Sequence, residues 1–506
     1  MEQEKRVVII GSGMGGLVCG AILAQEGYQV TVLEMNKQLG GNLQTYVRDK
    51  HIFDSGVHYV GGLDKGQNLY KIFKYLGIID LMKLEKLDEN AFDKIVFHSD
   101  DKEYAFAQGY DNFIQSLVKD FPEEEESIIK YCDSIRTVCS RFPLYNLRDG
   151  DYLEKSEYLT FDAKAHIDSL TSNQRLRSVL GGNNLLYAGV ADKTPFYVHA
   201  LVLNSYIESS YRFITGGSQI AKQLCRKILE NGGTIKNRTE IVKLHVEDGK
   251  VAYAEAKDGK RYHGDYFISN IHPARTLKMT ETDVIRHAYR NRIGSLENSS
   301  SIFILNITLK PDRFKYQKSN YYCFLEDEVW SVMDYNEDNW PKAYALFFSG
   351  LGPGKEYAEG ITLMAYMNFQ DVEPWAGTHN TVGSPGTRGE SYEEFKKRKA
   401  ELLITLAEKK FPGLRDAIHN YYTSSPLTFR DYMGTDDGSI YGIAKDFKDP
   451  LKTFISPRTK IENLLLTGQN INLHGILGVS ISSVVTCSVL LGMTEIIHKI
   501  EKAQDA

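Results

Sequence analysis

The sequence predicts an α/β fold, and three patterns support this prediction. Residues 7–10 form a continuous apolar run, followed at once by GSGMGG and then by apolar residues at helical spacing up to Gly27. This order is typical of a buried parallel strand, a tight turn and a helix. A second apolar run at 29–33 completes a strand–helix–strand unit, and 463–492 is predicted as a strand, a loop and a buried helix.

The first half of the middle region is predicted to be helical. Residues 100–210 carry helical patterns and many aromatic side chains, and Pro122 followed by four glutamates is typical of a helix N-terminus. Residues 216–233 form an amphipathic helical pattern that ends at two glycines. This region therefore predicts a helical cover over the sheet elements.

Strand patterns follow. Residues 234–269 alternate in short segments separated by two Asp-Gly pairs, which predicts a β-meander. Residues 301–380 are predicted mainly as strands, and a capping box at 391–394 predicts a helix that runs to about 410. We see no repeat and no clear linker, so we expect interleaved domains.

Composition excludes several classes of protein. The chain has 506 residues, with 42% hydrophobic and 25% charged residues, which is an ordinary globular mixture. Its 60 basic and 66 acidic residues give a net charge of −6, and no block of Lys or Arg stands out. We therefore expect no nucleic-acid partner.

The cysteines and apolar runs indicate a cytoplasmic chain. The six cysteines form no CxxC pair and no His/Cys cluster with zinc spacing, so we expect reduced thiols and no metal site. The apolar run at 7–10 is too short for a signal peptide, and those at 302–309 and 482–492 are too short to span a bilayer. Peripheral contact with a membrane stays open.

The glycine-rich turn predicts a dinucleotide site. Gly11, Gly13 and Gly16 form GxGxxG between the strand and the helix, where they allow a tight turn, close approach to a pyrophosphate and close helix packing. The helix N-terminus offers N–H groups to the phosphates. Glu34 ends the next strand, 18 residues after Gly16, where a carboxylate accepts hydrogen bonds from a ribose.

A second glycine pair, Gly40–Gly41, follows Glu34 by six positions. With it, the sequence resembles the FAD-dependent oxidoreductases of the amine oxidase and phytoene desaturase superfamily, whose signature is GxGxxGLxxxxxLxxxGxxVxVLExxxxxGG. The chain departs from that family at Asn42, where members usually carry arginine, so a basic phosphate contact is in doubt there. The segment LLLTGQNINLHGILGVSIS at 464–482 resembles the family's second flavin segment.

The resemblance implies FAD and a Rossmann-type, glutathione-reductase-like cofactor domain that is discontinuous in sequence. It implies that 1–75, 210–280 and 455–506 form this domain, and that 76–209 and 281–454 form an interleaved α+β substrate domain with a helical cover. The cofactor-binding positions it implies are Gly11, Gly13, Met14, Gly15, Gly16, Glu34, Met35, Gly40, Gly41, Asn42, Val57, His58, Val242, Asn270, Gly468, Gln469, Gly478 and Val479.

Two segments indicate the branch of the family. FDSGVHYVGG at 53–62 and TGQNINLHG at 467–475 resemble the retinol saturases, together with carotenoid isomerases and phytoene-desaturase-like proteins. The resemblance implies an enzyme that acts on C=C bonds of a long, apolar, conjugated isoprenoid, most simply by saturating one bond. Desaturation and isomerisation on the same fold stay open, and amine oxidation is a weaker alternative.

Saturating a C=C bond requires a hydride and a proton. His58, Tyr59 and His474 are the candidate proton donors, and His58 has the most suitable unperturbed pKa. A structural role for each histidine stays open. The electron donor is unknown from the sequence; we find no second dinucleotide fingerprint, so NAD(P)H is kept only as a transient donor.

Apolar and aromatic stretches near 142–147, 180–188 and 195–213 fit either ordinary core or a long substrate tunnel. An alternative of another class is an escort-type protein that binds isoprenoids without flavin. The intact Gly11/Gly13/Gly16 set and Glu34 argue against that alternative.

Overall fold

A five-stranded parallel sheet forms the centre of the computed structural model, which describes residues 5–100, 102–151, 153–352 and 354–505. Its strands are, in spatial order, β10 (Thr234–Lys236), β2 (Gln29–Leu33), β1 (Arg6–Ile10), β14 (Tyr266–Ser269) and β20 (Leu464–Leu466). The predicted strand–helix–strand unit at the start of the chain is confirmed. Residues 1–4, part of the stretch that argued against a signal peptide, lie outside the described residues.

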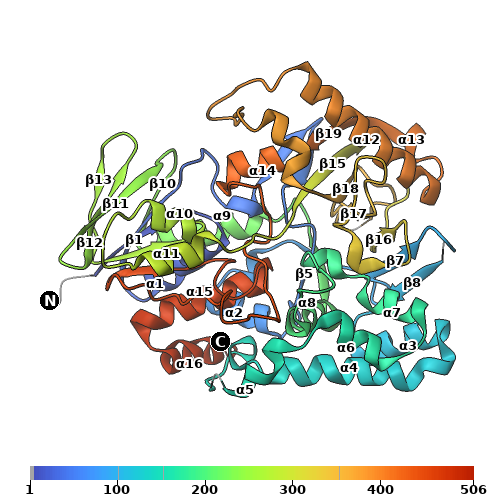
Figure 1. Ribbon diagram of the computed structural model, residues 1–506, viewed down its shortest axis with the longest axis horizontal. Coiled ribbons are helices and arrows are strands. Elements are labelled where there is room, and N and C mark those ends of the chain that lie inside the picture. The colour runs from blue at the N-terminus through green and yellow to red at the C-terminus, as the bar shows by residue number, and fades with distance from the viewer. Residues whose placement is uncertain (1–4, 101, 152, 353, 506) are drawn as a thin grey trace.

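Helices from both ends of the chain cover one face of this sheet (Figure 1). The helix α1 (Met14–Gln25) packs between α9 (Ser218–Glu230) and α15 (Gly475–Leu491). All of α1 except its last residue is buried, which explains why it is apolar on every side. The helices α16 (Met493–Lys502) and α2 (Asn68–Tyr75) pack against α15.

The predicted meander at 234–269 is correct only in its middle part. An antiparallel sheet contains β11 (Ile241–Glu247), β12 (Lys250–Ala256) and β13 (Arg261–Tyr262), beside α10 (Pro273–Lys278) and α11 (His287–Gly294). Strands β10 and β14 instead join the parallel sheet. The apolar run of β14 is buried on both faces, which suits an inner parallel strand better than a half-exposed hairpin.

A second, seven-stranded sheet lies on the other side of the molecule. Its strands are, in order, β19 (Ile418–Ser424), β15 (Ser301–Leu309), β18 (Gly360–Met367), β17 (Ala343–Phe348), β16 (Asn320–Phe324), β7 (Asp93–Phe97) and β8 (Glu103–Phe106). All neighbours are antiparallel except β16 and β7. Alternate residues of β15 face opposite sides of the sheet and belong to two different hydrophobic cores. Phe303 and Leu305 pack on the side of α12 (Glu390–Lys410), and Ile302 and Ile304 pack into the core on the other side.

Helices from 110–208 cover the lower edge of this second part in Figure 1. They are α3 (Tyr110–Asp120), α4 (Glu125–Ser140), α5 (Leu153–Ser156), α6 (Ala163–Leu170), α7 (Gln174–Gly181) and α8 (Phe196–Glu208). The remaining elements are β3 (Thr45–Arg48), β4 (His51–Asp54), β5 (Val60–Gly61), β6 (Leu84–Lys86), β9 (Ser210–Phe213), α13 (Leu414–Ala417) and α14 (Pro426–Met433).

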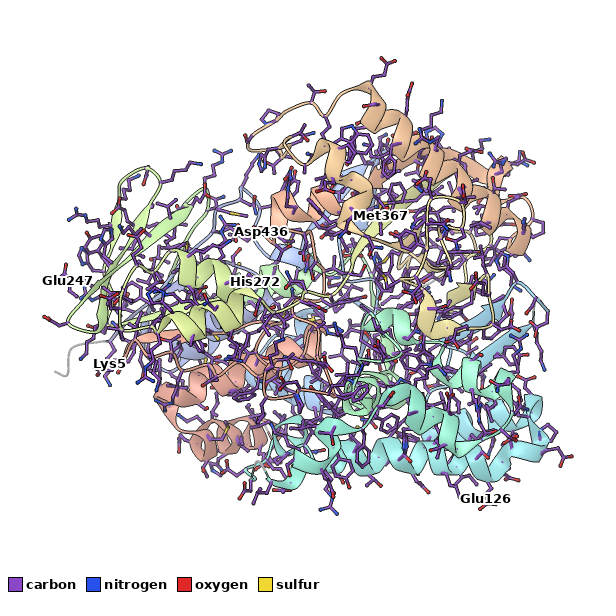
Figure 2. The ribbon with its side chains drawn as sticks, viewed as in Figure 1. Lys5, Glu126, Glu247, His272, Met367 and Asp436 are labelled. Carbon is purple, nitrogen blue, oxygen red and sulfur yellow. The ribbon has the colours of Figure 1, made fainter. Side chains whose placement is uncertain are left out.

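The strands of the parallel sheet come from the three segments predicted for the cofactor domain. The strands of the seven-stranded sheet come from the two segments predicted for the substrate domain. The domain boundaries themselves stay a prediction. In Figure 2, Glu126 and Glu247 lie at the rim of the molecule and Met367 lies well within it.

One helix start was predicted wrongly. The helix α12 begins at Glu390 with Gly389 as its N-cap and no side-chain cap, so the predicted capping box at 391–394 does not form. Ser391 lies inside the first turn, and its hydroxyl accepts a hydrogen bond from Trp375 Nε1 (3.1 Å). All six cysteines are free, as predicted. In the part of the chain that the structure describes, no helix is long and apolar enough to cross a membrane.

We expect Gly16→Ala to destabilise the protein. A Cβ atom at Gly16 would lie 2.1 Å from the carbonyl oxygen of Gly11, so α1 must move away from β1. The matched control is Gly294→Ala in α11, where a Cβ atom meets nothing within 4 Å. Thermal unfolding should show a Tm several degrees lower for Gly16→Ala, since a loss of about 1 kcal/mol already shifts Tm by about 2–4 °C in a large domain. Equal Tm values for the two variants would contradict this.

Candidate functional site

A large cavity lies between the carboxyl ends of the parallel strands and the seven-stranded sheet. It contains about 1950 Å³ of space free of protein atoms, including the solvent at its mouth. The carboxyl end of a parallel sheet is the usual ligand site in such folds, and residues from both sheets line this cavity.

Glycines make one wall of this cavity from backbone alone. A Cβ atom at Gly15 would lie 2.8 Å from the Cα atom of Gly468 and 2.4 Å from Asn270 Oδ1. A Cβ atom at Gly13 would lie 2.9 Å from Asn270 Nδ2. The backbone N–H of Asn270 donates to the carbonyl of Ile10 (2.9 Å), and its side-chain Nδ2 donates to the carbonyl of Gly11 (3.4 Å), which holds the side chain against the turn. Three segments distant in sequence thus meet at one place, with bare backbone facing the cavity.

Two helix N-termini lie at the cavity without a side-chain cap. The helix α1 begins after Gly13, and α15 begins after His474; neither N-cap residue forms a side-chain hydrogen bond to its helix. Such ends carry free N–H groups and partial positive charge. They are suited to phosphate oxygens at α1 and to negative charge on a ring system at α15.

Glu34 lies at the end of β2 and is only 5% exposed. Its Oε2 accepts hydrogen bonds from the amide (2.9 Å) and hydroxyl (2.7 Å) of Ser12, and its Oε1 accepts one from the amide of Asn36 (2.8 Å). These bonds fix the carboxylate at the cavity wall. Since a carboxylate accepts about four hydrogen bonds, capacity remains for a ligand hydroxyl.

The second glycine pair, Gly40–Gly41, packs against the glycine-rich turn at 11–16. Gly40 pairs with Gly13 as a parallel bridge, and its amide donates to the carbonyl of Ser12 (3.1 Å). Gly41 has φ +56°, and a Cβ atom there would lie 3.1 Å from the Cα atom of Gly13. The next residue, Asn42, lines the cavity with its Oδ1 buried and without a hydrogen-bond partner.

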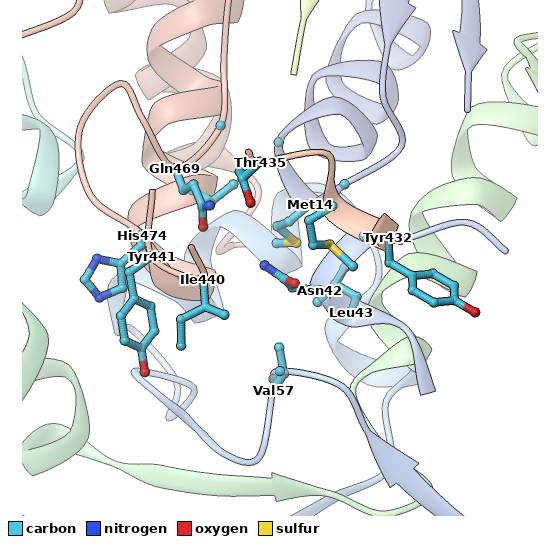
Figure 3. Close-up of a pocket in the computed structure, with 18 of the residues that line it drawn as sticks. Met14, Asn42, Leu43, Val57, Tyr432, Thr435, Ile440, Tyr441, Gln469 and His474 are labelled. Atoms are coloured by element: carbon cyan, nitrogen blue, oxygen red, sulfur yellow. The ribbon is translucent and has the colours of Figure 1, made fainter. Parts of the chain in front are cut away.

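The segment 56–59 enters the cavity from β4. The Asp54 carboxylate accepts a hydrogen bond from the amide of Gly217 (2.7 Å), and the hydroxyl and amide of Ser55 donate to the carbonyl of Gln44 (2.7 and 3.0 Å). Val57 and His58 then line the cavity. Figure 3 shows Val57 opposite Asn42 and Leu43.

His58 is an uncharged group at neutral pH. Its ring stacks on Phe347 with 4.7 Å between centroids, and its Nε2 is buried without a partner. Burial, and then the nearby positive charge of Arg212, lower the pKa of His58 to about 4. The sequence argument that favoured His58 for its unperturbed pKa is therefore wrong, because the imidazole is desolvated.

Tyr59 is hydrogen-bonded to a buried carboxyl group, that of Asp93. Its hydroxyl donates to Asp93 Oδ2 (2.8 Å) and lies 2.6 Å from the hydroxyl of Tyr322. Both tyrosines line the cavity, and Asp93 lies behind them with no exposed surface. Amide groups of Asn183 (2.7 Å) and Asn320 (2.8 Å) also donate to Asp93. Burial nevertheless raises the pKa of Asp93 to about 7.

His474 lies at the start of α15, between two cavities. Its Nε2 lies 3.0 Å from the carbonyl oxygen of Leu186, and its ring packs on Tyr441 with 4.5 Å between centroids. Burial lowers the pKa of His474 to about 4. Figure 3 shows His474 and Tyr441 side by side at one end of the cavity, away from Tyr432.

The comparisons with known proteins agree with this geometry. The family model for flavin containing amine oxidoreductases matches residues 14–305, which is more than half of the chain. The chain belongs to this family. Its members contain flavin, and membership implies FAD as the cofactor and an oxidoreductase activity.

Relatives and solved structures cover almost the whole chain. All-trans-retinol 13,14-reductase of Rattus norvegicus is 25% identical, with 97% of this chain and 86% of the relative covered. Prolycopene isomerase of Daucus carota is 25% identical over 87% of this chain and 72% of the relative. An oxidoreductase from Methanosarcina mazei has a similar fold, with a TM-score of 0.63, 17% identity and coverage of 96% and 99%.

The residues at the cavity fit the family's flavin cofactor. Bare glycine backbone and the uncapped α1 terminus suit a pyrophosphate, Glu34 suits a ribose, and the orphaned Asn42 Oδ1 and His58 Nε2 are free to bond with a ligand. The structure brings most of the predicted site residues to this cavity: Gly11, Gly13, Met14, Gly15, Glu34, Met35, Gly40, Gly41, Asn42, Val57, His58, Tyr59, Asn270, Gly468, Gln469, His474 and Val479.

Three predicted positions lie elsewhere. Gly16 packs against the backbone of Gly11 behind the turn. Val242 is 41% exposed on β11, and it is its neighbour Ile241 that lines the cavity. Gly478 lines a second cavity, on the other side of the α15 start. The cofactor roles of all predicted residues stay predictions.

Sequence reasoning missed the wall supplied by 432–441. Tyr432 lines the cavity from the last turn of α14, and Thr435, Ile440 and Tyr441 line it from the loop that follows. This loop carries no motif, and the sequence placed it in the substrate domain. Asp93 and Tyr322 were also missed, since a lone acid or tyrosine on a buried strand has no spacing that marks it.

The second cavity is lined in part by the apolar and aromatic stretches of the sequence, and their role as a substrate tunnel stays a prediction. Residues 142–145, Leu186 and several residues of α8 line it, within the stretches that fitted either core or tunnel. It shares Leu186, Tyr206, His474, Gly475 and Ile476 with the first cavity. Across the described ranges, no group of three or more His, Cys, Asp or Glu side chains is placed to hold a metal ion.

We expect Gly13→Leu to lose the flavin. The new side chain must occupy the space between Asn270 and the cavity, where the backbone faces the ligand. Absorbance near 450 nm relative to protein absorbance measures bound flavin after purification. The control is Gly377→Leu, at an exposed glycine whose Cβ atom would meet nothing within 4 Å. Normal flavin content in folded Gly13→Leu would overturn the role of this turn.

Proposed function

We propose that this flavin oxidoreductase acts on C=C bonds of a long, apolar, conjugated isoprenoid, and that it saturates one bond. The observation that carries the proposal is the pair of adjoining cavities. One has the backbone features of a dinucleotide site, and the other is an apolar continuation that shares its wall at Tyr206 and Ile476. The names of the retinol reductase and prolycopene isomerase relatives support the same substrate class.

The second cavity is suited to an extended apolar chain. Its walls are largely aliphatic and aromatic, with Val60, Leu144, Leu201 and Ile481 on the aliphatic side and Phe142, Tyr145 and Tyr197 on the aromatic side. Rigid aromatic surfaces contact a flat polyene at low entropic cost. The tyrosines Tyr59, Tyr322 and Tyr366 continue this surface into the first cavity.

When bound, the flavin supplies or accepts the hydride. The chain's own residues then have to hold the cofactor, orient the polyene and provide the proton. Gly13, Gly15, Glu34 and Gly468 line the dinucleotide end, and the α15 N-terminus lies at the opposite end with Val479. A positive helix end there stabilises negative charge that develops during reduction.

The proton is best supplied by Asp93 through Tyr59 or Tyr322. Burial raises the pKa values of both Asp93 and Asp54 to about 7, whereas the pKa values of His58 and His474 are lowered to about 4. Of the two acids, Asp93 is hydrogen-bonded to a tyrosine that lines the cavity. A group titrating near the working pH is the better proton donor. When Asp93 is protonated, the 2.8 Å hydrogen bond runs from Asp93 to Tyr59, and Asp93 replaces the proton that Tyr59 Oη passes to the substrate carbon. Tyr322, whose hydroxyl lies 2.6 Å from that of Tyr59, offers the second route.

Product mass distinguishes the three reactions that this fold supports. The protein is incubated without oxygen with retinoids and carotenoids, with the flavin either oxidised or reduced by dithionite. A gain of about two mass units that requires reduced flavin is the expected result. A loss of two with oxidised flavin identifies a desaturase, and an unchanged mass with a new retention time identifies an isomerase. No turnover of any polyene contradicts the substrate class.

The electron donor is tested in the same assay. An arm with NADPH or NADH replaces dithionite, and flavin bleaching near 450 nm follows the reduction. Rapid bleaching supports NAD(P)H as the transient donor. Bleaching by dithionite alone indicates that another protein reduces the flavin.

We expect Asp93→Asn to slow saturation and to remove its pH dependence. With a pKa near 7, Asp93 carries its proton below that pH and loses it above, so the wild-type rate should fall as pH rises through about 7. The amide cannot reprotonate Tyr59, and general acid catalysis typically contributes about 10²–10⁴-fold. The rate constant under single-turnover conditions with pre-reduced flavin measures this step.

Asp371→Asn is the control for this variant. Asp371 also accepts a hydrogen bond from a tyrosine hydroxyl, that of Tyr335 (2.6 Å), but Tyr335, unlike Tyr59, lines neither cavity. It should keep the wild-type rate and pH profile. A wild-type profile in Asp93→Asn with full flavin content would exclude Asp93 as the proton source.

A further inference from the structure

The second cavity contains a lysine that forms no ion pair with a carboxylate of the residues that the structure describes. Lys445 lines this cavity, and its Nζ donates to the carbonyl oxygen of Thr453 at 3.3 Å. Among the described residues, no carboxylate forms an ion pair with it. Most lysines near the surface of this protein do have such a partner; Lys193 pairs with Glu297 and Lys448 with Asp192.

The surroundings of Lys445 are apolar. Aliphatic side chains such as Leu473 and Leu477 line the same cavity, together with the ring of Phe454. Burial lowers the pKa of Lys445 to about 8. Burying a cation without a counter-ion costs free energy. An anionic group of an apolar ligand pairs with the charge of Lys445, and the apolar part of that ligand leaves water at the same time.

Other charged groups around the cavity do not neutralise Lys445. Lys155 also lines the cavity, and burial lowers its pKa. Asp151 lies on the same wall but is exposed, and its Oδ1 accepts the amide of Leu153 (3.0 Å) at the start of α5. His474 is kept uncharged by burial, and the charge of Lys445 lowers its pKa further. None of these groups supplies a negative charge beside Lys445.

We propose that the second cavity binds the carboxylate end of a long apolar molecule, with Lys445 as its counter-ion. This inference deepens the proposed function and rests on it for the position of the substrate. The apolar chain extends past Tyr206 and Ile476 into the first cavity, and the carboxylate stays beside Lys445. A hydroxyl end needs no cation, and a phosphate end needs more donors than these side chains offer. A monoanionic carboxylate matches the site.

Equilibrium dialysis tests this assignment without turnover. The FAD-loaded, oxidised protein is dialysed at pH 7 against all-trans-retinoic acid, all-trans-retinol and methyl retinoate, and against oleic acid and methyl oleate. Each acid should bind about 10- to 100-fold more tightly than its ester, as expected for a hydrogen bond to a charged partner. At pH 9.5, above the pKa of Lys445, this preference should largely disappear.

Variants assign the preference to one side chain. Lys445→Met should bind acid and ester equally, Lys445→Arg should keep most of the preference, and Lys448→Met, three residues further on, should behave as wild type. Flavin absorbance checks that each variant is folded. If Lys445→Met does not fold, the pH titration of the wild type and the Lys445→Arg variant still decide the question.

The outcomes separate this inference from the proposed function. Equal binding of acid and ester by the wild type, or a preference that survives in Lys445→Met, overturns the carboxylate site. Tight binding of retinol with no gain for the acid leaves the polyene proposal intact and removes this inference. A preference for oleic over methyl oleate without any retinoid binding supports the carboxylate site and contradicts the polyene class. Failure of all five ligands overturns both.

Discussion

The close approach of three chain segments at Gly15, Asn270 and Gly468 is the constraint on which the rest of the structure depends. A side chain at Gly15 would meet the backbone of Gly468, so β1, α1 and the loop after β20 can be this close only with glycine there. The contact joins the two ends of the chain and seats α1 against α15. It also leaves a wall of bare N–H and carbonyl groups, which is what a pyrophosphate requires.

Removal of water from the side chains near His58, His474 and Asp93 sets which of these groups are charged. The same burial that lowers the pKa of His58 and His474 raises that of Asp93, since each group is driven towards its uncharged form. Histidine then loses its usual advantage as a proton donor near neutral pH, and a carboxyl group gains it. The flavin site and the apolar cavity are thus coupled, because the low polarity that suits a polyene also sets which residue holds a proton.

Local signals in the sequence were sufficient for the elements that carry strong periodicity or glycine patterns. The first strand–helix–strand unit, the helix at 475–491 and the cavity positions of Glu34 and Gly41 were predictable for this reason. Strand partners were less predictable. Strand β14 looked like the last strand of a meander, yet it pairs with β1, because only the folded sheet offers its apolar faces full burial. Likewise, Tyr441 and Tyr322 reach the cavity from segments without any motif.

The sequence by itself determined the glycine-rich turn, the flavin family and most residues that line the cavity at that turn, because glycine spacing and a terminal acid are local requirements of backbone geometry. Tertiary structure alone decided the Tyr59–Asp93–Tyr322 cluster, the second cavity and the position of Lys445 in its wall. Each of these depends on which side chains from distant segments exclude water together. Burial is a property of the packed chain, and it sets both the pKa values and the shape of the substrate space.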